Sequence, residues 1–157
     1  MKKYFAIIIV TLLLTSCATK SSFHSFYKEN KKESDFSISS PAFIANLFIP
    51  RDDVQEYEAL FKNVRHYKVM IFSESSTTLD KKFNRFINSK NYTSIFRISQ
   101  NGEKIQFYFL KNGNQIREMI LKVKNDTDFV LLGLKTNISE NDFNTIVENS
   151  DVKVARN

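Results

Sequence analysis

Residues 92–136 read YTSIFRISQNGEKIQFYFLKNGNQIREMILKVKNDTDFVLLGLKT, and this stretch decides the fold. It holds four runs rich in β-branched and aromatic residues, each followed by turn residues: Tyr92–Gln100, Glu103–Lys111, Gln115–Lys124 and Asp128–Thr136. Asn101-Gly102 and Asn112-Gly113 separate the first three runs. Asn-Gly is the pair favoured in type I′ hairpin turns, because both central residues of that turn need a positive φ. The stretch therefore predicts a four-stranded antiparallel meander.

The residues before the meander predict helices and two further strands. We expect helices over residues 23–32, 42–49, 52–64 and 79–89, and strands over residues 35–39 and 66–73. Ser40 is expected to cap the second helix, with Pro41 at its first position, where a missing N–H costs nothing. That helix is mostly apolar, so we expect it to be buried. Thr77 and Asp80 have the spacing of a capping box.

A last helix is predicted over residues 139–149, with Ser139 and Asp142 as its capping box. The fold class that follows is α+β: an antiparallel sheet with the four-strand meander in its C-terminal half and helices packed on one face. Residues 23–150 are expected to form a single domain, since 141 residues after position 16 suit one core. Residues 151–157 are expected to be a flexible tail.

The first sixteen residues have the pattern of an export signal. Lys2 and Lys3 form a basic start, and Tyr4–Leu14 is an uncharged, mostly apolar run. A helix needs about 20 apolar residues to cross a bilayer, so this run is too short to span it. Its length suits the apolar region of a secretory signal peptide, which we predict over residues 1–16.

Leu14-Thr15-Ser16-Cys17 resembles the lipobox of bacterial lipoproteins. The resemblance implies that Cys17 is S-diacylated, that the chain is cut before it, and that its new amine is acylated too. Two or more acyl chains give stable anchoring in a membrane. Residues 17–22 would then be a lipidated tether. The alternatives are an ordinary signal peptide with an accidental cysteine, or a buried apolar segment. Cys17 is the only cysteine, which excludes an intramolecular disulfide.

Ala18 follows the cysteine, and by the sorting rules of enterobacterial lipoproteins this residue predicts an outer-membrane protein. Residues 18–22 lack the acidic cluster that resembles a surface-export signal in Bacteroidetes, so we expect the protein to face the periplasm. The chain carries a formal charge of +6, which becomes +4 when Lys2 and Lys3 are removed. We expect no nucleic acid as partner of an exported protein. Anionic lipid headgroups are a candidate partner. Lys81, Lys82 and Arg85 form a candidate membrane-facing basic patch, for which a solvated helix face is the alternative.

Motifs with a known chemistry are missing from the sequence. It has no GxSxG, HExxH, CxxC, Walker A or GxGxxG pattern, and His24 and His66 are isolated. We therefore predict no catalytic residue, no metal and no cofactor. The leading hypothesis is a membrane-anchored, non-enzymatic binding or interaction module that meets an envelope protein partner. The alternative is an envelope-acting hydrolase whose site has no recognisable pattern.

Three segments of the meander, residues 101–108, 116–121 and 128–132, are similar to the Bacteroidetes lipoprotein family called domain of unknown function 4252. The resemblance covers residues 23–149. It implies an exported lipoprotein with no assigned activity and no catalytic residues to transfer, and it suggests a role in envelope homeostasis or signalling. Thr136 departs from the family pattern, in which a glycine is expected at a turn.

Overall fold

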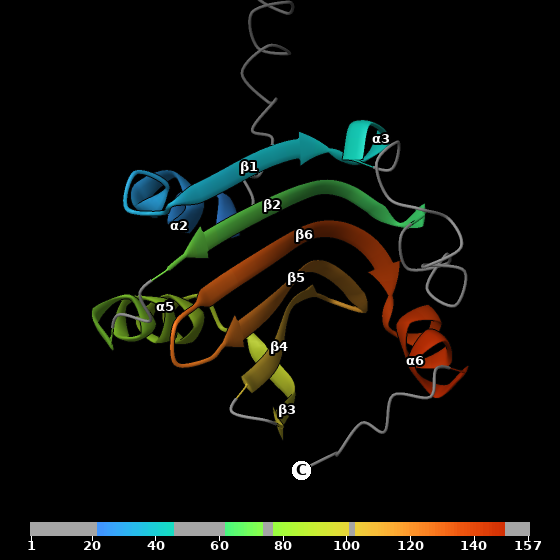
Figure 1. Cartoon of the computed structure of the whole chain (residues 1–157). Helices are drawn as coiled ribbons and strands as arrows, with labels where there is room; N and C mark the ends of the chain where they lie inside the picture. Colours follow the sequence, from blue (N-terminus) through green and yellow to red (C-terminus); the bar gives the residue numbers. More distant parts are fainter. Residues whose placement is uncertain (1–21, 46–61, 74–76, 101–102, 150–157) are drawn as a thin grey trace, which may run out of the picture.

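The computed structural model describes residues 22–45, 62–73, 77–100 and 103–149. They form a six-stranded antiparallel sheet of order β1-β2-β6-β5-β4-β3, with β1 and β3 at its edges (Figure 1). The strands are β1 (Phe36–Pro41), β2 (Val64–Phe72), β3 (Thr93–Gln100), β4 (Glu103–Asn112), β5 (Gln115–Lys124) and β6 (Phe129–Ser139). The helices are α2 (Ser22–Asn30), α3 (Ala42–Ala45), α5 (Thr77–Ser89) and α6 (Glu140–Asn149). The predicted α+β class and the antiparallel meander are confirmed.

Met70, Ile120 and Leu131 lie on the inner face of the sheet and are fully buried. Successive side chains of a strand point to opposite faces, so these three residues share one face through the strand register. Helices α2 and α5 lie side by side over this face and add a cluster of phenylalanines to the core. The rings of Phe26 and Phe83 meet edge to face with centroids 5.5 Å apart. The predicted packing of helices on one face is confirmed in α2 and α5.

The outer face of the sheet, which carries Val69, Leu121 and Leu132, is apolar but only half-buried. Helices α3 and α6 contact this face at one end of the sheet. There the rings of Phe109 and Phe143 lie with centroids 6.3 Å apart. The two faces therefore differ in how completely the described helices cover them.

Three pairs of neighbouring strands shift register toward the end of the sheet where α3 and α6 lie: β2–β6 between Val64 and His66, β4–β5 between Leu110 and Lys111, and β5–β6 between Ile116 and Glu118. The extra residue is Arg65 in β2 for the first pair and Arg117 in β5 for the second. A bulge adds one residue to a strand, bends it and reverses the alternation of side chains beyond it. Ile116 consequently clusters with Met119. Simple alternation would group Ile116 with Glu118, and the bulge is the reason that the two residues lie on opposite faces.

The expected capping of the second helix is also wrong. Ser40 and Pro41 belong to β1, and α3 begins at Ala42. Within α3, Phe43 is 72% exposed and Ile44 is 40% exposed, so the described part of the predicted buried helix is largely open to solvent. This helix is exposed because it follows β1, which lies at the edge of the sheet.

Several sequence predictions lie wholly or mainly outside the described residues. These are the signal peptide over 1–16, the acylated Cys17, most of the helix over 52–64, and the tail over 151–157. Val64, expected at the end of that helix, is instead the first residue of β2. In the ranges that the structure describes, no helix is long and apolar enough to cross a membrane.

The turns differ in detail from the sequence prediction. Asn112 is the last residue of β4, so the central residues of that hairpin are Gly113 and Asn114. Gly113 has a φ of 59°, and Asn91 is the only non-glycine residue of the described chain with a positive φ. This is the pattern of a type II′ turn rather than type I′. Thr136 lies within β6 instead of a turn, and its hydroxyl donates to the carbonyl oxygen of Ile116 at 2.8 Å.

Candidate functional site

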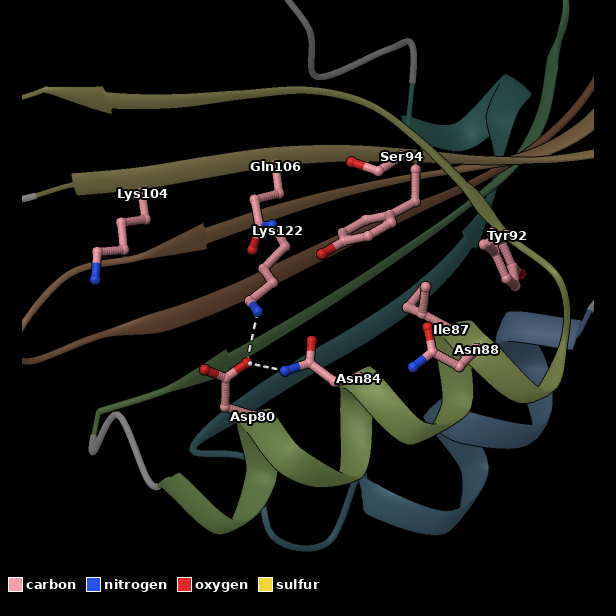
Figure 2. A pocket seen from close by; sticks show the side chains of 10 residues that line it. Asp80, Asn84, Ile87, Asn88, Tyr92, Ser94, Lys104, Gln106 and Lys122 are labelled. Atoms are coloured by element: carbon pink, nitrogen blue, oxygen red, sulfur yellow. Dashed lines mark hydrogen bonds and ion pairs between the residues drawn. The ribbon is translucent and has the colours of Figure 1, made fainter. Parts of the chain in front are cut away.

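A polar cleft of about 650 Å³ lies between α5 and strands β3 to β5 (Figure 2). Its walls combine amides, hydroxyls and charged groups: Asp80, Asn84, Ile87, Asn88, Tyr92, Ser94, Lys104, Gln106, Tyr108 and Lys122. In the close view, Asn84 and Asn88 project from α5 toward the side chains of the sheet. The cleft therefore offers several hydrogen-bonding groups to one small molecule.

Lys122 is the most buried charge of the cleft, with a side chain that is only 4% exposed. Its ammonium group donates to Asp80 Oδ1 at 2.5 Å, while Lys124 donates to Asp80 Oδ2 at 3.0 Å. The Lys122 ammonium also lies 5.5 Å from the ring centroids of Phe83 and Phe129, within the range of a cation–π contact. One carboxylate thus holds two ammonium groups at the edge of the aromatic core.

The ionisation of Asp80 follows from these contacts. Burial is the largest single effect and raises the pKa of this carboxyl. The hydrogen bonds and charges of Lys122 and Lys124 lower it, and together they outweigh burial. The resulting pKa lies below the ordinary value. Asp80 is consequently ionised at neutral pH and remains an acceptor for its two lysines.

The strand register places a third lysine next to this group. Lys104 on β4 lies directly opposite Lys124 on β5, and Gln106 lies opposite Lys122. Like charges that face each other across two strands are destabilising. Asp80 is the one carboxylate among the described residues of the cleft lining, so the three lysines carry two more positive charges than it balances. These four side chains together therefore have a surplus of positive charge.

Asp80 lies in the first turn of α5. Thr77 is the first residue of that helix and not a residue before it, so the predicted capping box of Thr77 and Asp80 is not the role of this carboxylate. The Asp80 carboxylate instead accepts hydrogen bonds from Lys122 and Lys124 of the sheet. The capping box predicted at Ser139 and Asp142 does form: the Asp142 amide donates to Ser139 Oγ at 3.1 Å.

A second buried polar group joins α2 to the sheet. Glu118 on β5 is 5% exposed and accepts hydrogen bonds from the backbone amides of Ser22 and Phe23 at 2.6 and 2.9 Å. The hydroxyl of Tyr92 donates to the same carboxylate at 2.6 Å. Burial, and then the charge and hydrogen bond of Glu118, raise the pKa of Tyr92 far above its ordinary value. The N-terminus of α2 is thus held by a carboxylate from a distant strand.

The predicted basic patch lies on α5. Lys81 and Arg85 are exposed, whereas Lys82 forms an ion pair with Glu33 at 2.9 Å. The two histidines belong to separate elements. His66 Nε2 lies 2.8 Å from the hydroxyl of Ser39. Among the described residues, no group of three or more His, Cys, Asp or Glu side chains is placed to hold a metal ion.

Sequence reasoning missed Lys122 and Glu118 as site residues. Both lie on the inner face of β5, on either side of the fully buried Ile120. A charged residue that shares the parity of buried apolar residues in one strand is a signal for a polar site, because an unpaired buried charge is costly. The bulge beside Glu118 weakens that signal by interrupting the alternation.

The sequence profile of a family described as "Domain of unknown function (DUF4252)" matches residues 27–146. The chain belongs to this family. The match covers β1 to β6, so in this DUF4252 chain the cleft and Glu118 both lie within the family region. No curated protein and no solved structure matches the chain. The resemblance noted at the meander is therefore confirmed.

Proposed function

We propose that this DUF4252 protein is a lipid-anchored protein of the cell envelope whose domain binds a small, polar, anionic ligand without converting it. The lipobox at Cys17 supports the anchor, and the surplus of lysine in the α5 cleft supports an anionic ligand. The domain would lie on the periplasmic side of the outer membrane and act as a binding or interaction module. An envelope protein partner would respond when the ligand is bound.

The register pair Lys104–Lys124 is the observation that carries the ligand class. These two lysines occupy facing positions on neighbouring strands, and Lys124 shares the Asp80 carboxylate with Lys122, so an anion bound beside Lys104 would offset the excess positive charge. The amides of Asn84, Asn88 and Gln106 line the same cleft and suit a ligand rich in hydroxyl groups. A sugar that bears a carboxylate or a phosphate combines both features.

The chemistry of Asp80 favours binding over hydrolysis. Enzymes that hydrolyse glycosidic bonds generally use two carboxyl groups, one of which has a raised pKa and donates a proton. Asp80 is the one carboxyl group in the described lining of the cleft, and its pKa is lowered. Lys122 and Lys124 also donate to both carboxylate oxygens of Asp80, so neither oxygen is open to exchange a proton with a substrate.

Calorimetry of the full-length chain in detergent tests the ligand class. Glucuronate and glucose 6-phosphate are expected to bind, whereas glucose is expected to bind more weakly. Lys104→Gln should weaken the binding of both anions by about tenfold, since a hydrogen bond to a charged group contributes about 1.5 kcal/mol. Lys90→Gln, an exposed lysine outside the cleft, is the matched control. Equal binding of glucose and its anionic derivatives would contradict the proposal.

Fractionation of cells tests the anchor separately. Cys17→Ser should move the protein from the membrane to the soluble fraction without lowering its unfolding temperature, since position 17 lies before the described domain. The intact mass of the parent protein should show the acyl chains and the loss of residues 1–16. A variant that stays in the membrane fraction, or a parent mass without lipid, would count against the anchor.

A further inference from the structure

The β1 edge of the sheet lacks most of the features that usually protect an edge strand, and Pro41 at its last position is the exception. Phe36–Pro41 contains no charged residue and its pairing with β2 runs without a register shift. Phe36 is 51% exposed and Ile38 is 48% exposed. Among the described residues, no strand pairs with the outer side of β1. Such an edge offers a row of backbone hydrogen-bonding groups to another chain.

The opposite edge is protected. Strand β3 has a register shift between Ser94 and Phe96, which β1 lacks. A bulge of this kind hinders edge-to-edge pairing. The contrast within one sheet singles out β1 as an edge that can accept a partner.

Exposed apolar side chains occur on β1 and on the helix that follows it. Phe43 and Ile44 of α3 are exposed, and together with Phe36 and Ile38 of β1 they make up what we call the β1–α3 patch. These four are the exposed large hydrophobic side chains of the described chain. Exposed apolar side chains gathered in one segment favour an interaction site.

We propose that the β1 edge pairs with the β1 edge of a second copy of this chain, in antiparallel orientation, to form a two-fold dimer with one continuous sheet. In an antiparallel pair, opposite residues point to the same face. A two-fold axis near Ile38 therefore brings the two Ile38 side chains together on the outer face. It places the serines at 37 and 39 of both copies on the inner face. The same patch on both copies makes a self-complementary interface.

The tether favours a second copy over another protein. The two-fold axis of an antiparallel pair is perpendicular to the sheet, so the inner faces of both copies point the same way. Ser22 is bound to Glu118 on that face, which places both tethers on one side of the dimer. Two acyl anchors then reach the same bilayer. Confinement to a membrane raises the effective concentration of the two edges. This step rests on the proposed anchor, whereas the strand pairing itself rests on β1 alone.

Cysteine cross-linking in membranes tests the dimer. The parent chain has one cysteine, so each of residues 36–40 can be replaced by cysteine in turn and the membranes oxidised with copper phenanthroline. Directly opposite Cβ atoms are about 5 Å apart, close enough for a disulfide after a small movement. At least one position should give a cross-linked product of twice the chain mass. Thr93→Cys, an exposed position on the β3 edge, and the parent chain should give none.

A second variant keeps the test decisive. Ile38→Lys, added to the cysteine variant that cross-links best, places a charge on the edge and should reduce the dimer product at least tenfold. Its unfolding temperature should be unchanged, because Ile38 is exposed. The proposal is overturned if no position from 36 to 40 gives a dimer, if Thr93→Cys cross-links equally, or if the product contains a different protein.

Discussion

At the residue scale, the carboxylate of Glu118 holds the first turn of α2 against the sheet. It accepts two backbone amides from the first turn of α2 and one hydroxyl from Tyr92. A negative charge at a helix N-terminus is favourable because the unpaired amides carry a partial positive charge. Lys68, a buried lysine on β2, is close enough to interact with this carboxylate. Burial lowers the pKa of Lys68, and the charge of Glu118 raises it by a smaller amount. The buried negative charge of Glu118 thus has an opposite charge in the core.

Glu118→Gln should destabilise the protein by about 3 kcal/mol, because an amide has one acceptor oxygen for three donors and leaves buried groups unpaired. Tyr92→Phe removes a single hydrogen bond and should cost about 1.5 kcal/mol. Urea unfolding of the two variants measures both values. A loss for Glu118→Gln no larger than that for Tyr92→Phe would show that the α2 contacts contribute little.

His66 predicts a pH dependence of stability. Burial, followed by the charges of Lys68, Lys135 and His24, lowers the pKa of His66 below 6.5. The unfolded chain therefore binds a proton at a higher pH than the folded chain. The free energy of unfolding should fall as the pH drops through about 6.5, and this loss should stop once the folded-state pKa is passed.

His66→Gln should flatten this decrease while keeping a polar side chain beside Ser39. Urea titrations at several values between about pH 8 and 5 compare the two proteins in the range where histidine titrates. Parallel curves for the parent and the variant would mean that other groups cause the pH dependence.

At the scale of elements, α2 lies close to β6 because of Gly133. A Cβ atom at this position would overlap the ring of Phe23, the buried residue in the first turn of α2. The φ of Gly133 is not positive, so the close approach of the helix explains the glycine and backbone strain does not. The sheet and the helix therefore constrain each other's composition at this contact.

Gly133→Ala should destabilise the protein by about 2 kcal/mol, in the range for overpacking a core. Gly113→Ala is the control: nothing lies within 4 Å of the added Cβ, but its φ of 59° makes the backbone unfavourable for alanine, at a cost of about 1 kcal/mol. Adding Phe23→Ala should remove most of the extra loss in Gly133→Ala and none of that in Gly113→Ala, as thermal unfolding can show. Additive losses at positions 23 and 133 would contradict the steric explanation.

At the scale of the whole molecule, charge and tether lie on the same layer. Helices α2 and α5 cover the inner face, α2 begins at the end of the predicted tether, and α5 carries Lys81 and Arg85 exposed. With the proposed anchor at Cys17, this basic helix would be attracted to an anionic bilayer surface. The inner face of the sheet would then be directed toward the membrane.

Neutralising Lys81, Lys82 and Arg85 to glutamine in the Cys17→Ser chain should weaken binding to anionic vesicles by roughly 30-fold, since each basic residue near such a surface contributes about 1 kcal/mol. Two full contributions are expected, because Lys82 is paired with Glu33. Arg65, Lys111 and Arg117, also exposed, form a control set of equal charge whose removal should change vesicle sedimentation less. An equal effect of the two sets would indicate non-specific attraction.

The sequence alone was sufficient for the α+β class, the meander and the family, because hydrophobic alternation and turn residues act over short stretches. Helical spacing also groups Leu79, Phe83 and Ile87 on one side of α5, and all three are buried. The tertiary structure decided everything that depends on register: the facing pair Lys104–Lys124, the contact of Asp80 with the sheet, the role of Glu118 and the open edge of β1. Bulges shift parity and strand order selects the edges, and both result from contacts between residues far apart in the chain, which a local pattern does not encode.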